Sequence, residues 1–223
     1  SQPAIVTATI AAFEAYKAKR PQAPSFAAGL SLGEYSGLIA AGVFTLEDGI
    51  KLVKRRGEIM EEAARKHPGK MAAIIELPLD TLREICRVAG ASIANLNCPG
   101  QTIITGTAET VDKAKAACQA AGAKRVLELE VSGGFHSPLM TEASSMLKDF
   151  LDTIPMSAPA FPVISNYTAQ PASSVVQIKQ NLIAQMYSEV RWEESMRFIL
   201  AQGTASFYEF GPGKVLRGLM RKI

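Results

Sequence analysis

The segment Gly29-Leu30-Ser31-Leu32-Gly33 is a G-x-S-x-G pattern that follows a short apolar run and opens a helix-favouring stretch. This context predicts a strand-to-helix turn with the serine at its tip. Small residues flank a nucleophilic serine in such a turn because the backbone is tight and the side chain must stand clear of it. The first N–H groups of the following helix also lack partners and lie near the serine oxygen. We therefore predict that Ser31 is a catalytic nucleophile; the alternative is a glycine-rich turn with an incidental serine.

A serine hydroxyl is a weak nucleophile and needs a base, and the sequence holds only two histidines. His67 ends a charged helical stretch next to Pro and Gly, so we expect it at the surface. His136 lies in the apolar, glycine-rich segment 131–137. A lone histidine is more often structural than catalytic, but together with the serine turn it predicts that His136 is the general base.

Composition narrows the class of protein. Hydrophobic residues make up 48% and charged residues 20% of the 223 residues, as in an ordinary globular protein. No run of 18 apolar residues and no signal peptide is present, which predicts no membrane segment. The net charge of +3 is too mild to indicate nucleic acid, although it suits an acidic protein partner.

The three cysteines are scattered without C-x-x-C spacing. Such a set argues against a disulfide framework and against a zinc site, and it predicts buried thiols in a reducing compartment. We therefore expect a cytoplasmic protein, or one of a reducing organelle such as a plastid or mitochondrion, without a zinc site.

The first and last parts of the chain read as alternating helices and strands. Residues 1–69 predict helices at 4–19, 32–41 and 46–66 and a buried strand at 25–30. Residues 131–223 predict helices at 139–151, 176–187 and 192–201, strands at 161–165 and 206–210, and a basic helix at the C-terminus. This alternation predicts one α/β core with a mostly parallel sheet that is covered on both faces.

The order of predicted helices and strands is different in the middle of the chain. This part predicts strands at 71–76, 91–97, 102–105 and 125–131 and helices at 79–88 and 108–121, the second of them capped near Thr107. The order β-α-β-β-α-β is the split-βαβ, or ferredoxin-like, pattern. We therefore predict that residues 70–130 form an inserted ferredoxin-like subdomain within the core.

Several motifs recur in this order in one family. They are GLSLGEY at 29–35, KRRG at 54–57, MAAII at 71–75, NLNCPGQ at 95–101, VSGGFH at 131–136, QMY at 185–187 with Trp192, and YEFGPGKVL at 208–216. Together they resemble the malonyl-CoA:acyl carrier protein transacylases of type II fatty acid synthesis, and the resemblance covers essentially the whole chain. It implies an α/β-hydrolase-like core with a ferredoxin-like insertion, in agreement with the organisation above.

The resemblance implies ping-pong transfer of malonyl from malonyl-CoA to the phosphopantetheine thiol of acyl carrier protein, through a malonyl-serine intermediate and without a cofactor. Ser31 would be the acylated residue and His136 its base. The backbone carbonyl of Gln185 would hold the other imidazole nitrogen, and the backbone N–H of Leu32 would be an oxyanion-hole donor.

Further residues would bind substrate if the resemblance holds. The guanidinium of Arg56 would pair bidentately with the malonyl carboxylate, whereas its neighbours at 54 and 55 would lie on a solvated helix face. Asn95 and Asn97 would lie near the acyl or pantetheine group, although Asn beside Pro-Gly is also ordinary turn chemistry. Phe135 resembles the malonyl-selecting version of its loop, in which the ring would crowd an α-methyl branch. The acidic carrier protein would dock on basic residues, namely Lys124, Arg125, Lys214, Arg217, Arg221 and Lys222.

The sequence departs from the family in two places. Many members have His before the nucleophile, where this chain has Leu30; since that side chain is not the base, we expect the change to tune the pocket. The family also begins with a strand and a Gly-Gln-Gly-type loop, whose backbone supplies the second oxyanion donor, and these lie before the first residue of this sequence. Loss of one such donor costs about 10²–10³ in rate.

Two other functions remain open at this point. A serine esterase or thioesterase of the α/β-hydrolase class would use the same turn, but it places an acid and then the histidine late in the chain. Arg56 also has no obvious task on a neutral ester. The second alternative is a non-catalytic fragment that binds carrier protein or a partner enzyme.

Overall fold

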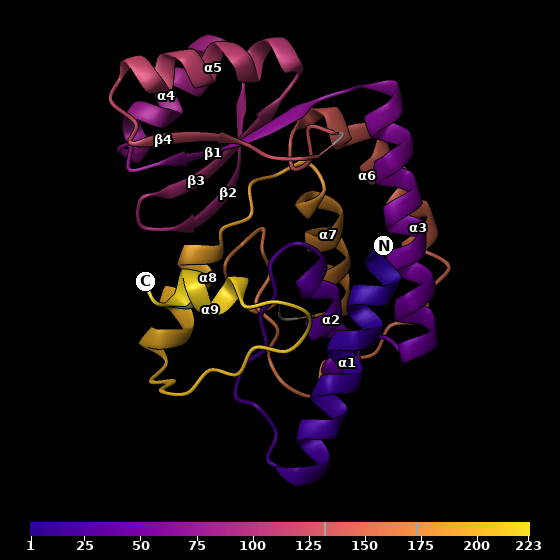
Figure 1. The fold of residues 1–223 in the computed structure, drawn as a ribbon. Coiled ribbons are helices and arrows are strands. Elements are labelled where there is room, and N and C mark those ends of the chain that lie inside the picture. The colour runs from indigo at the N-terminus through magenta and orange to yellow at the C-terminus, as the bar shows by residue number, and fades with distance from the viewer. Residues whose placement is uncertain (132, 173) are drawn as a thin grey trace.

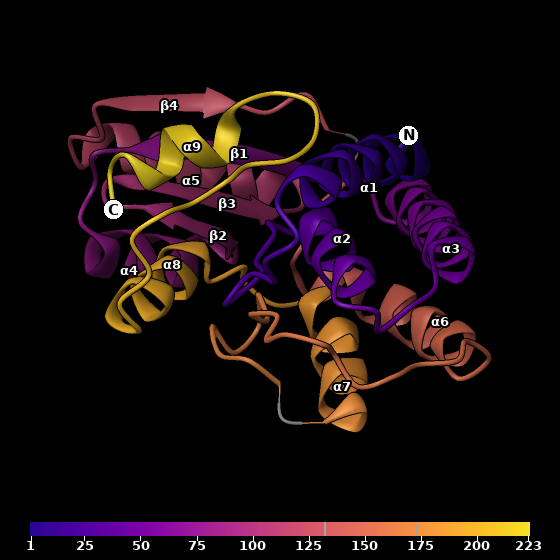
Figure 2. The same ribbon diagram turned by 90° about the horizontal axis from the view of Figure 1, so that it is seen from below.

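The computed structural model describes residues 1–131, 133–172 and 174–223 as a mixed α/β structure (Figure 1). Ser132, which falls in the predicted loop before His136, lies outside the described residues. The views in Figures 1 and 2 agree that α1, α2, α3, α6 and α7 gather on one side of the molecule, while an antiparallel sheet lies on the other side together with α4 and α5. Within the described residues no helix is both long and apolar enough to cross a bilayer.

The helical side begins with three helices close to their predicted bounds: α1 Gln2–Lys19, α2 Leu32–Ala40 and α3 Leu46–Lys66. Thr45 caps α3, because its side chain accepts a hydrogen bond from the N–H of Asp48. Ser1 precedes α1, but its side chain makes no capping hydrogen bond, contrary to a simple reading of its residue type. The buried faces of these helices form one apolar core with those of α6 and α7, including Val6, Leu38, Leu52, Leu147 and Leu182.

The remaining helices follow residue 137. They are the short 3₁₀ turn η1 Pro138–Met140, α6 Thr141–Leu151, α7 Val175–Gln185, α8 Trp192–Ala201 and α9 Val215–Met220. α8 and α9 pack on a second apolar cluster that contains Ile164, Val190 and Trp192. This cluster also contains Cys98 of the sheet, so it joins the two sides of the molecule.

The middle of the chain has the predicted order of elements. These are β1 Lys70–Ile75, α4 Leu79–Ala89, β2 Ser92–Cys98, β3 Gln101–Gly106, α5 Ala108–Ala120 and β4 Arg125–Glu128. The sheet is antiparallel with strand order β2-β3-β1-β4. Thr107 caps α5 as expected, by accepting from the N–H of Thr110. β4 ends three residues before the predicted bound of 131.

The side chains of β1 alternate between two environments, as the period of a strand requires. Ala72 and Ile74 pack with the buried faces of α4 and α5, which cover one face of the sheet (Figure 1). Met71 and Ala73 point to the opposite face, where Phe135 packs against them. The sheet therefore supports the segment that carries His136.

Three segments predicted as strands, 25–30, 161–165 and 206–210, are not strands. The predicted mostly parallel sheet is thus not formed in the part of the chain that the structure describes; parallel pairing there is limited to the isolated bridges Ala27–Val163 and Asn95–Val190. A strand needs a partner over several residues, and 25–30 meets 161–165 only around Ala27. Residues 206–210 instead run along α1, where Tyr208 and Phe210 pack on Tyr16.

The two connections between the middle segment and the rest of the chain pass side by side at glycines. Pro68 bridges to Gly133, and a Cβ added to Gly69 would lie 2.3 Å from the backbone nitrogen of Gly134 and 2.7 Å from the carbonyl oxygen of Gly106. These neighbours are backbone atoms, which cannot turn away as a flexible side chain can. The approach of the two connections therefore depends on the absence of a side chain at Gly69.

We predict that Gly69→Ala lowers the free energy of unfolding by about 1–3 kcal/mol, because the added methyl group overpacks a backbone contact. Gly218→Ala in α9 is the matched control, since nothing lies within 4 Å of the added Cβ, and alanine there should leave stability unchanged or raise it by up to about 1 kcal/mol. Urea unfolding of both variants measures the difference. Equal effects of the two substitutions would contradict the steric account.

Candidate active site

Ser31 occupies the tip of a tight turn immediately before α2. Its backbone has φ +52° and ψ −101°, an uncommon conformation for a residue other than glycine and one that is typical of functional turns. A Cβ added to Gly29 would lie 2.0 Å from the carbonyl carbon of Gly33, whereas a Cβ added to Gly33 meets nothing within 4 Å. The turn therefore requires the first glycine of the G-x-S-x-G pattern for steric reasons, and not the second.

Asn166 clamps this turn from a distant part of the chain. Its Oδ1 accepts a hydrogen bond from the N–H of Ser31 at 2.6 Å, and its Nδ2 donates to the carbonyl oxygen of Gly29 at 2.7 Å. Our sequence analysis did not single out this residue. No local pattern marks it, because its role depends on a contact across more than a hundred residues of sequence.

His136 is buried and lies between Ser31 and Gln185. Its Nε2 is 2.9 Å from Ser31 Oγ, and its Nδ1 is 2.8 Å from the backbone oxygen of Gln185. A carbonyl oxygen can only accept, so Nδ1 carries the proton and Nε2 accepts from the serine hydroxyl. The two residues thus meet as the sequence predicted, and the carbonyl lies where a carboxylate lies in many serine hydrolases.

Burial and the nearby Arg56 guanidinium together lower the pKa of His136 to about 4, although backbone hydrogen bonds with Gln185 and Ser188 oppose the shift. The imidazole is therefore neutral at pH 7, which is the form that can take a proton from Ser31. The other histidine, His67, is exposed at the end of α3, as expected.

Arg56 of α3 is 1% exposed and reaches the same serine. Its Nη2 donates to Ser31 Oγ at 3.0 Å and to Gln185 Oε1 at 3.2 Å, and its Nη1 donates to Gln2 Oε1 at 2.9 Å. The guanidinium also lies 5.1 Å from the centre of the Tyr35 ring.

The charge of Arg56 is not neutralised by a direct ion pair. Among the described residues, no carboxylate lies within 4.0 Å of its guanidinium, and its Nε has no hydrogen-bond partner. A buried cation with only neutral partners is costly unless an anion can join it. Lys54, by contrast, is exposed, and Arg55 pairs with Glu58 at 3.7 Å, so these two form the solvated face that we predicted.

Glu34 is a second charged residue of the site, and our sequence analysis gave it no role. It lies in the first turn of α2 and is 2% exposed. Its Oε2 accepts from the N–H of Asn166 at 2.9 Å and from Gln185 Nε2 at 2.7 Å. Burial raises the pKa of Glu34 to about 7, although these hydrogen bonds and Arg56 oppose the rise. The available signal was its position as the one charged residue of an otherwise uncharged helix.

The other predicted site residues lie around this cluster. Leu32 is the first residue of α2, so its N–H has no partner within the helix and is adjacent to Ser31. Phe135 is partly buried between the large helical core and the sheet. Asn95 and Asn97 are buried in β2, and the structure gives neither a hydrogen bond to Ser31, His136 or Arg56.

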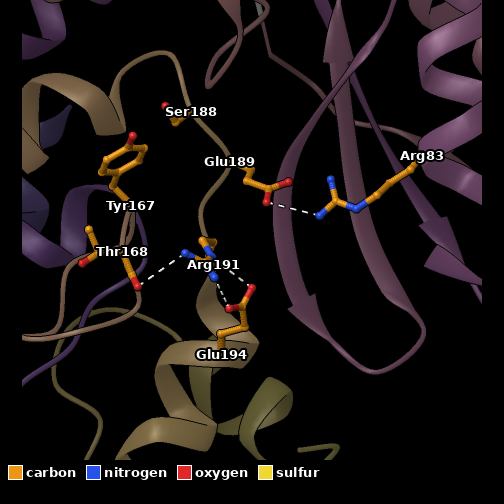
Figure 3. A pocket seen from close by; sticks show the side chains of 7 residues that line it. All are labelled: Arg83, Tyr167, Thr168, Ser188, Glu189, Arg191 and Glu194. Carbon is orange, nitrogen blue, oxygen red and sulfur yellow. Dashed lines mark hydrogen bonds and ion pairs between the residues drawn. The ribbon is translucent and has the colours of Figure 1, made fainter. Parts of the chain in front are cut away.

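A cavity of about 440 Å³ lies close to the site, and Figure 3 shows the side chains that line it. Its walls include Tyr167, the neighbour of Asn166, and Ser188, whose backbone hydrogen-bonds to His136. Two arginines also line it, and each is paired: Arg83 with Glu189 at 3.2 Å, and Arg191 with Glu194. The cavity is therefore lined by polar side chains, and the charges of its two arginines are balanced by carboxylates. Asn95 lies beside it, because its bridge to Val190 falls between two lining residues.

Across residues 1–131, 133–172 and 174–223, no group of three or more His, Cys, Asp or Glu side chains is placed to hold a metal ion. The three cysteines are unpaired and buried. The chemistry that this arrangement offers is a serine nucleophile with a neutral imidazole base, beside a buried guanidinium.

Comparison with known proteins agrees with this chemistry. The acyl transferase domain family matches residues 1–221. The malonyl CoA-acyl carrier protein transacylase of Bacillus subtilis (strain 168) is 44% identical over 228 residues, which cover 100% of this chain and 72% of that protein. The protein of the same name from Escherichia coli (strain K12) is 41% identical over 227 residues, which cover 100% of this chain and 74% of its own length.

Solved structures are similar over the whole chain. The malonyl-CoA:acyl carrier protein transacylase of Xanthomonas oryzae pv. oryzae KACC10331 superposes with a TM-score of 0.96 at 38% identity, covering 99% of this chain and 72% of that chain. A malonyl-transacylase in complex with its type II PKS acyl-carrier protein also gives a TM-score of 0.96, at 40% identity and with coverage of 99% and 73%.

The two glycines of the serine turn differ in a testable way. We predict that Gly29→Ala lowers the rate at which a fluorophosphonate probe labels Ser31 by about 10²-fold or more, because the methyl group forces the tight turn open and misplaces the hydroxyl. Gly33→Ala is the matched control and should keep the thermal unfolding midpoint within about 2 °C, since the added methyl group meets open space. Loss of labelling in a well-folded Gly33→Ala, with labelling retained in Gly29→Ala, would refute this assignment.

Proposed function

The chain belongs to the acyl transferase domain family, and on that premise we propose that it transfers malonyl from malonyl-CoA to the phosphopantetheine thiol of acyl carrier protein in fatty acid biosynthesis. The observation that carries the proposal is the convergence of two side chains on one serine oxygen. Ser31 Oγ is 2.9 Å from the His136 imidazole and 3.0 Å from the Arg56 guanidinium. A nucleophile, a base and a carboxylate receptor thus share one site.

The first half-reaction acylates Ser31. His136 Nε2 takes the hydroxyl proton while Oγ attacks the thioester carbonyl and forms a tetrahedral oxyanion. The oxyanion collapses, the carbon–sulfur bond breaks, and His136 returns the proton to the leaving coenzyme A thiolate. The Gln185 carbonyl keeps Nδ1 protonated throughout, and the 2.8 Å contact supports this role. The Leu32 N–H is our proposed oxyanion donor.

Arg56 is our proposed receptor for the malonyl carboxylate. In the free protein its Nη2 donates to the serine Oγ. Once Oγ becomes an ester oxygen it is a poorer acceptor, so the guanidinium is released to bind the carboxylate of the same malonyl group. A planar guanidinium fork fits a carboxylate bidentately, and the absence of a direct acidic partner in the described structure leaves that capacity open.

The second half-reaction reverses the first. The pantetheine thiol of the carrier protein gives its proton to His136 and attacks the malonyl-serine ester, which frees Ser31. The charge-balanced cavity has room for part of the uncharged pantetheine arm. Asn95 of β2 bridges to Val190, which lies between two residues that line the cavity, and this supports a place for Asn95 and Asn97 near that arm. Phe135 would restrict branching at the α-carbon.

We also propose a finer description of the fold. The core, residues 1–69 and 131–223, is α/β-hydrolase-like, and residues 70–130 are a ferredoxin-like insertion. The tight turn that places Ser31 immediately before α2 supports the first part. The β-α-β-β-α-β order and the strand order β2-β3-β1-β4 support the second part.

The two rival functions fit the site less well. An esterase for neutral esters has no use for a buried guanidinium at its nucleophile, and here the group that holds the imidazole is a backbone carbonyl of Gln185. A protein that only binds has no need for a serine hydroxyl held against a neutral imidazole in a strained turn.

Intact mass after incubation with malonyl-CoA tests the proposal. We predict one malonyl adduct on the wild-type chain and none on Ser31→Ala. Arg56→Ala should lower the malonylation rate by about 10- to 100-fold, the range expected for a lost charged hydrogen bond, while transfer of acetyl is spared. Lys54→Ala, on the exposed face of the same helix, is the matched control. A wild-type chain without an adduct overturns the proposal, and an unchanged acyl preference in Arg56→Ala favours the esterase.

Docking of the carrier protein on basic residues should affect only the second half-reaction. Lys124 is paired with Glu76 at 2.7 Å, but within the described residues no carboxylate lies in ion-pair distance of the five other basic candidates. We predict that Arg217→Glu with Arg221→Glu slows transfer to carrier protein by about tenfold or more at low salt and leaves serine malonylation unchanged. The double reversal Lys51→Glu with Lys54→Glu, at two exposed positions of α3, is the charge-matched control. Equal loss in both half-reactions would count against docking at α9.

A further inference from the structure

A buried carboxyl group lies behind the serine turn and has no part in the mechanism above. Glu34 touches neither Ser31 Oγ nor His136, yet its carboxylate accepts two hydrogen bonds inside the site, from the Asn166 backbone and from the Gln185 side chain. Burial of a carboxyl is unfavourable unless such partners are present. The carboxylate in turn holds the residues that donate to it.

The Gln185 side chain gains a fixed orientation. Its Nε2 donates to Glu34 Oε2 at 2.7 Å and to the backbone oxygen of Ser31 at 3.1 Å, and Asn166 Oδ1 is a more distant acceptor at 3.5 Å. Its Oε1 is thereby turned toward Arg56 Nη2, which donates to it at 3.2 Å. An amide can present either its oxygen or its NH₂ group in a given direction, and the carboxylate, as the nearest and the only charged acceptor among these, most strongly favours the NH₂ group here.

The same residue holds the general base. The backbone oxygen of Gln185 accepts from His136 Nδ1, so one residue joins Glu34, the imidazole and the guanidinium. Asn166 provides a second route, because its backbone N–H binds Glu34 while its side chain clamps both sides of the Ser31 turn. Movement of the Glu34 carboxylate would therefore displace Ser31, His136 and Arg56 through these hydrogen bonds.

The charges around Glu34 are few. Arg56 from α3 acts on it through space without an ion pair, and the ring of Tyr35 from its own helix has its pKa raised by burial and by the Glu34 charge. His136 faces the site as a neutral ring. The groups from α7 and from the segment at 165–166 are polar but uncharged. Glu34 thus balances Arg56 at a distance that leaves the guanidinium free to bind a second carboxylate.

We propose that Glu34 is a positioning residue for malonyl transfer, which acts through Gln185 and Asn166 and never touches the substrate. The inference rests on the function proposed above. Protonation would remove the negative charge of Glu34 and weaken the hydrogen bonds that Oε2 accepts, so the Gln185 amide would be held less firmly with its oxygen toward Arg56. The same residue holds His136 through its backbone carbonyl, so the support of the base would loosen as well.

This role predicts a particular pH dependence. Glu34 must be ionised, and its pKa is raised to about 7, whereas the pKa of His136 is lowered to about 4. Activity is then present above pH 7 and falls as the pH drops through about 7, well before His136 takes up a proton. The fall in the malonylation rate at acid pH therefore reports protonation of Glu34 and not of His136.

The test is the pH profile of kcat/KM for malonylation of Ser31 from pH 5 to pH 9. The wild type should show an acid limb near pH 7. Glu34→Gln should lose about 10- to 100-fold at pH 8, mainly in kcat, and its limb near pH 7 should vanish. Glu58→Gln, an exposed carboxylate of α3, should retain the wild-type profile. A purely structural role would lower stability without removing the limb.

A second variant keeps the test decisive if Glu34→Gln does not fold. Gln185→Leu retains the backbone carbonyl but disconnects Glu34, so it should also lose the limb near pH 7, and adding Glu34→Gln to it should cause little further loss. An unchanged limb in a folded variant overturns the inference. If the wild type itself forms no malonyl-serine adduct, the proposed function fails first; if it forms the adduct but has no limb near pH 7, only the role of Glu34 fails.

Discussion

The site depends on the burial of three ionisable groups in one small volume without a direct ion pair between them. Arg56, Glu34 and His136 are each at most 5% exposed. The neutral amide of Gln185 lies between the carboxylate and the guanidinium, and the imidazole stays uncharged. A direct pair would satisfy both charges but would close the guanidinium to any other carboxylate. Separation by an amide leaves the guanidinium free to bind another carboxylate.

The rest of the fold serves this arrangement by delivering each group from a different element. The turn before α2 brings Ser31, α2 brings Glu34, α3 brings Arg56, and the end of α7 brings Gln185. The loop with His136 follows β4 and rests on the sheet through its neighbour Phe135. A rigid contact between the two parts of the chain is needed to hold that loop, and the close approach of glycines where they join provides it.

The sequence predicted the local elements well wherever local physics determines them. The bounds of α3 and α8 and the cap at Thr107 follow from periodicity and side-chain chemistry within a few residues. The predicted strands at 25–30, 161–165 and 206–210 were wrong. An apolar run indicates burial, but whether it becomes a strand depends on a partner backbone that periodicity does not reveal.

The residue types alone determined the chemistry of this protein: one serine in a glycine-flanked turn, two histidines of which one lies in an apolar loop, and one arginine in a motif shared with a known family. Only the tertiary structure showed that these groups meet at Ser31 Oγ, and that Asn166 and Glu34 hold them there. The reason is physical. The type of a side chain and its local conformation are encoded nearby in the chain, whereas the solvation of a buried charge is decided by whatever residues the whole fold brings to it.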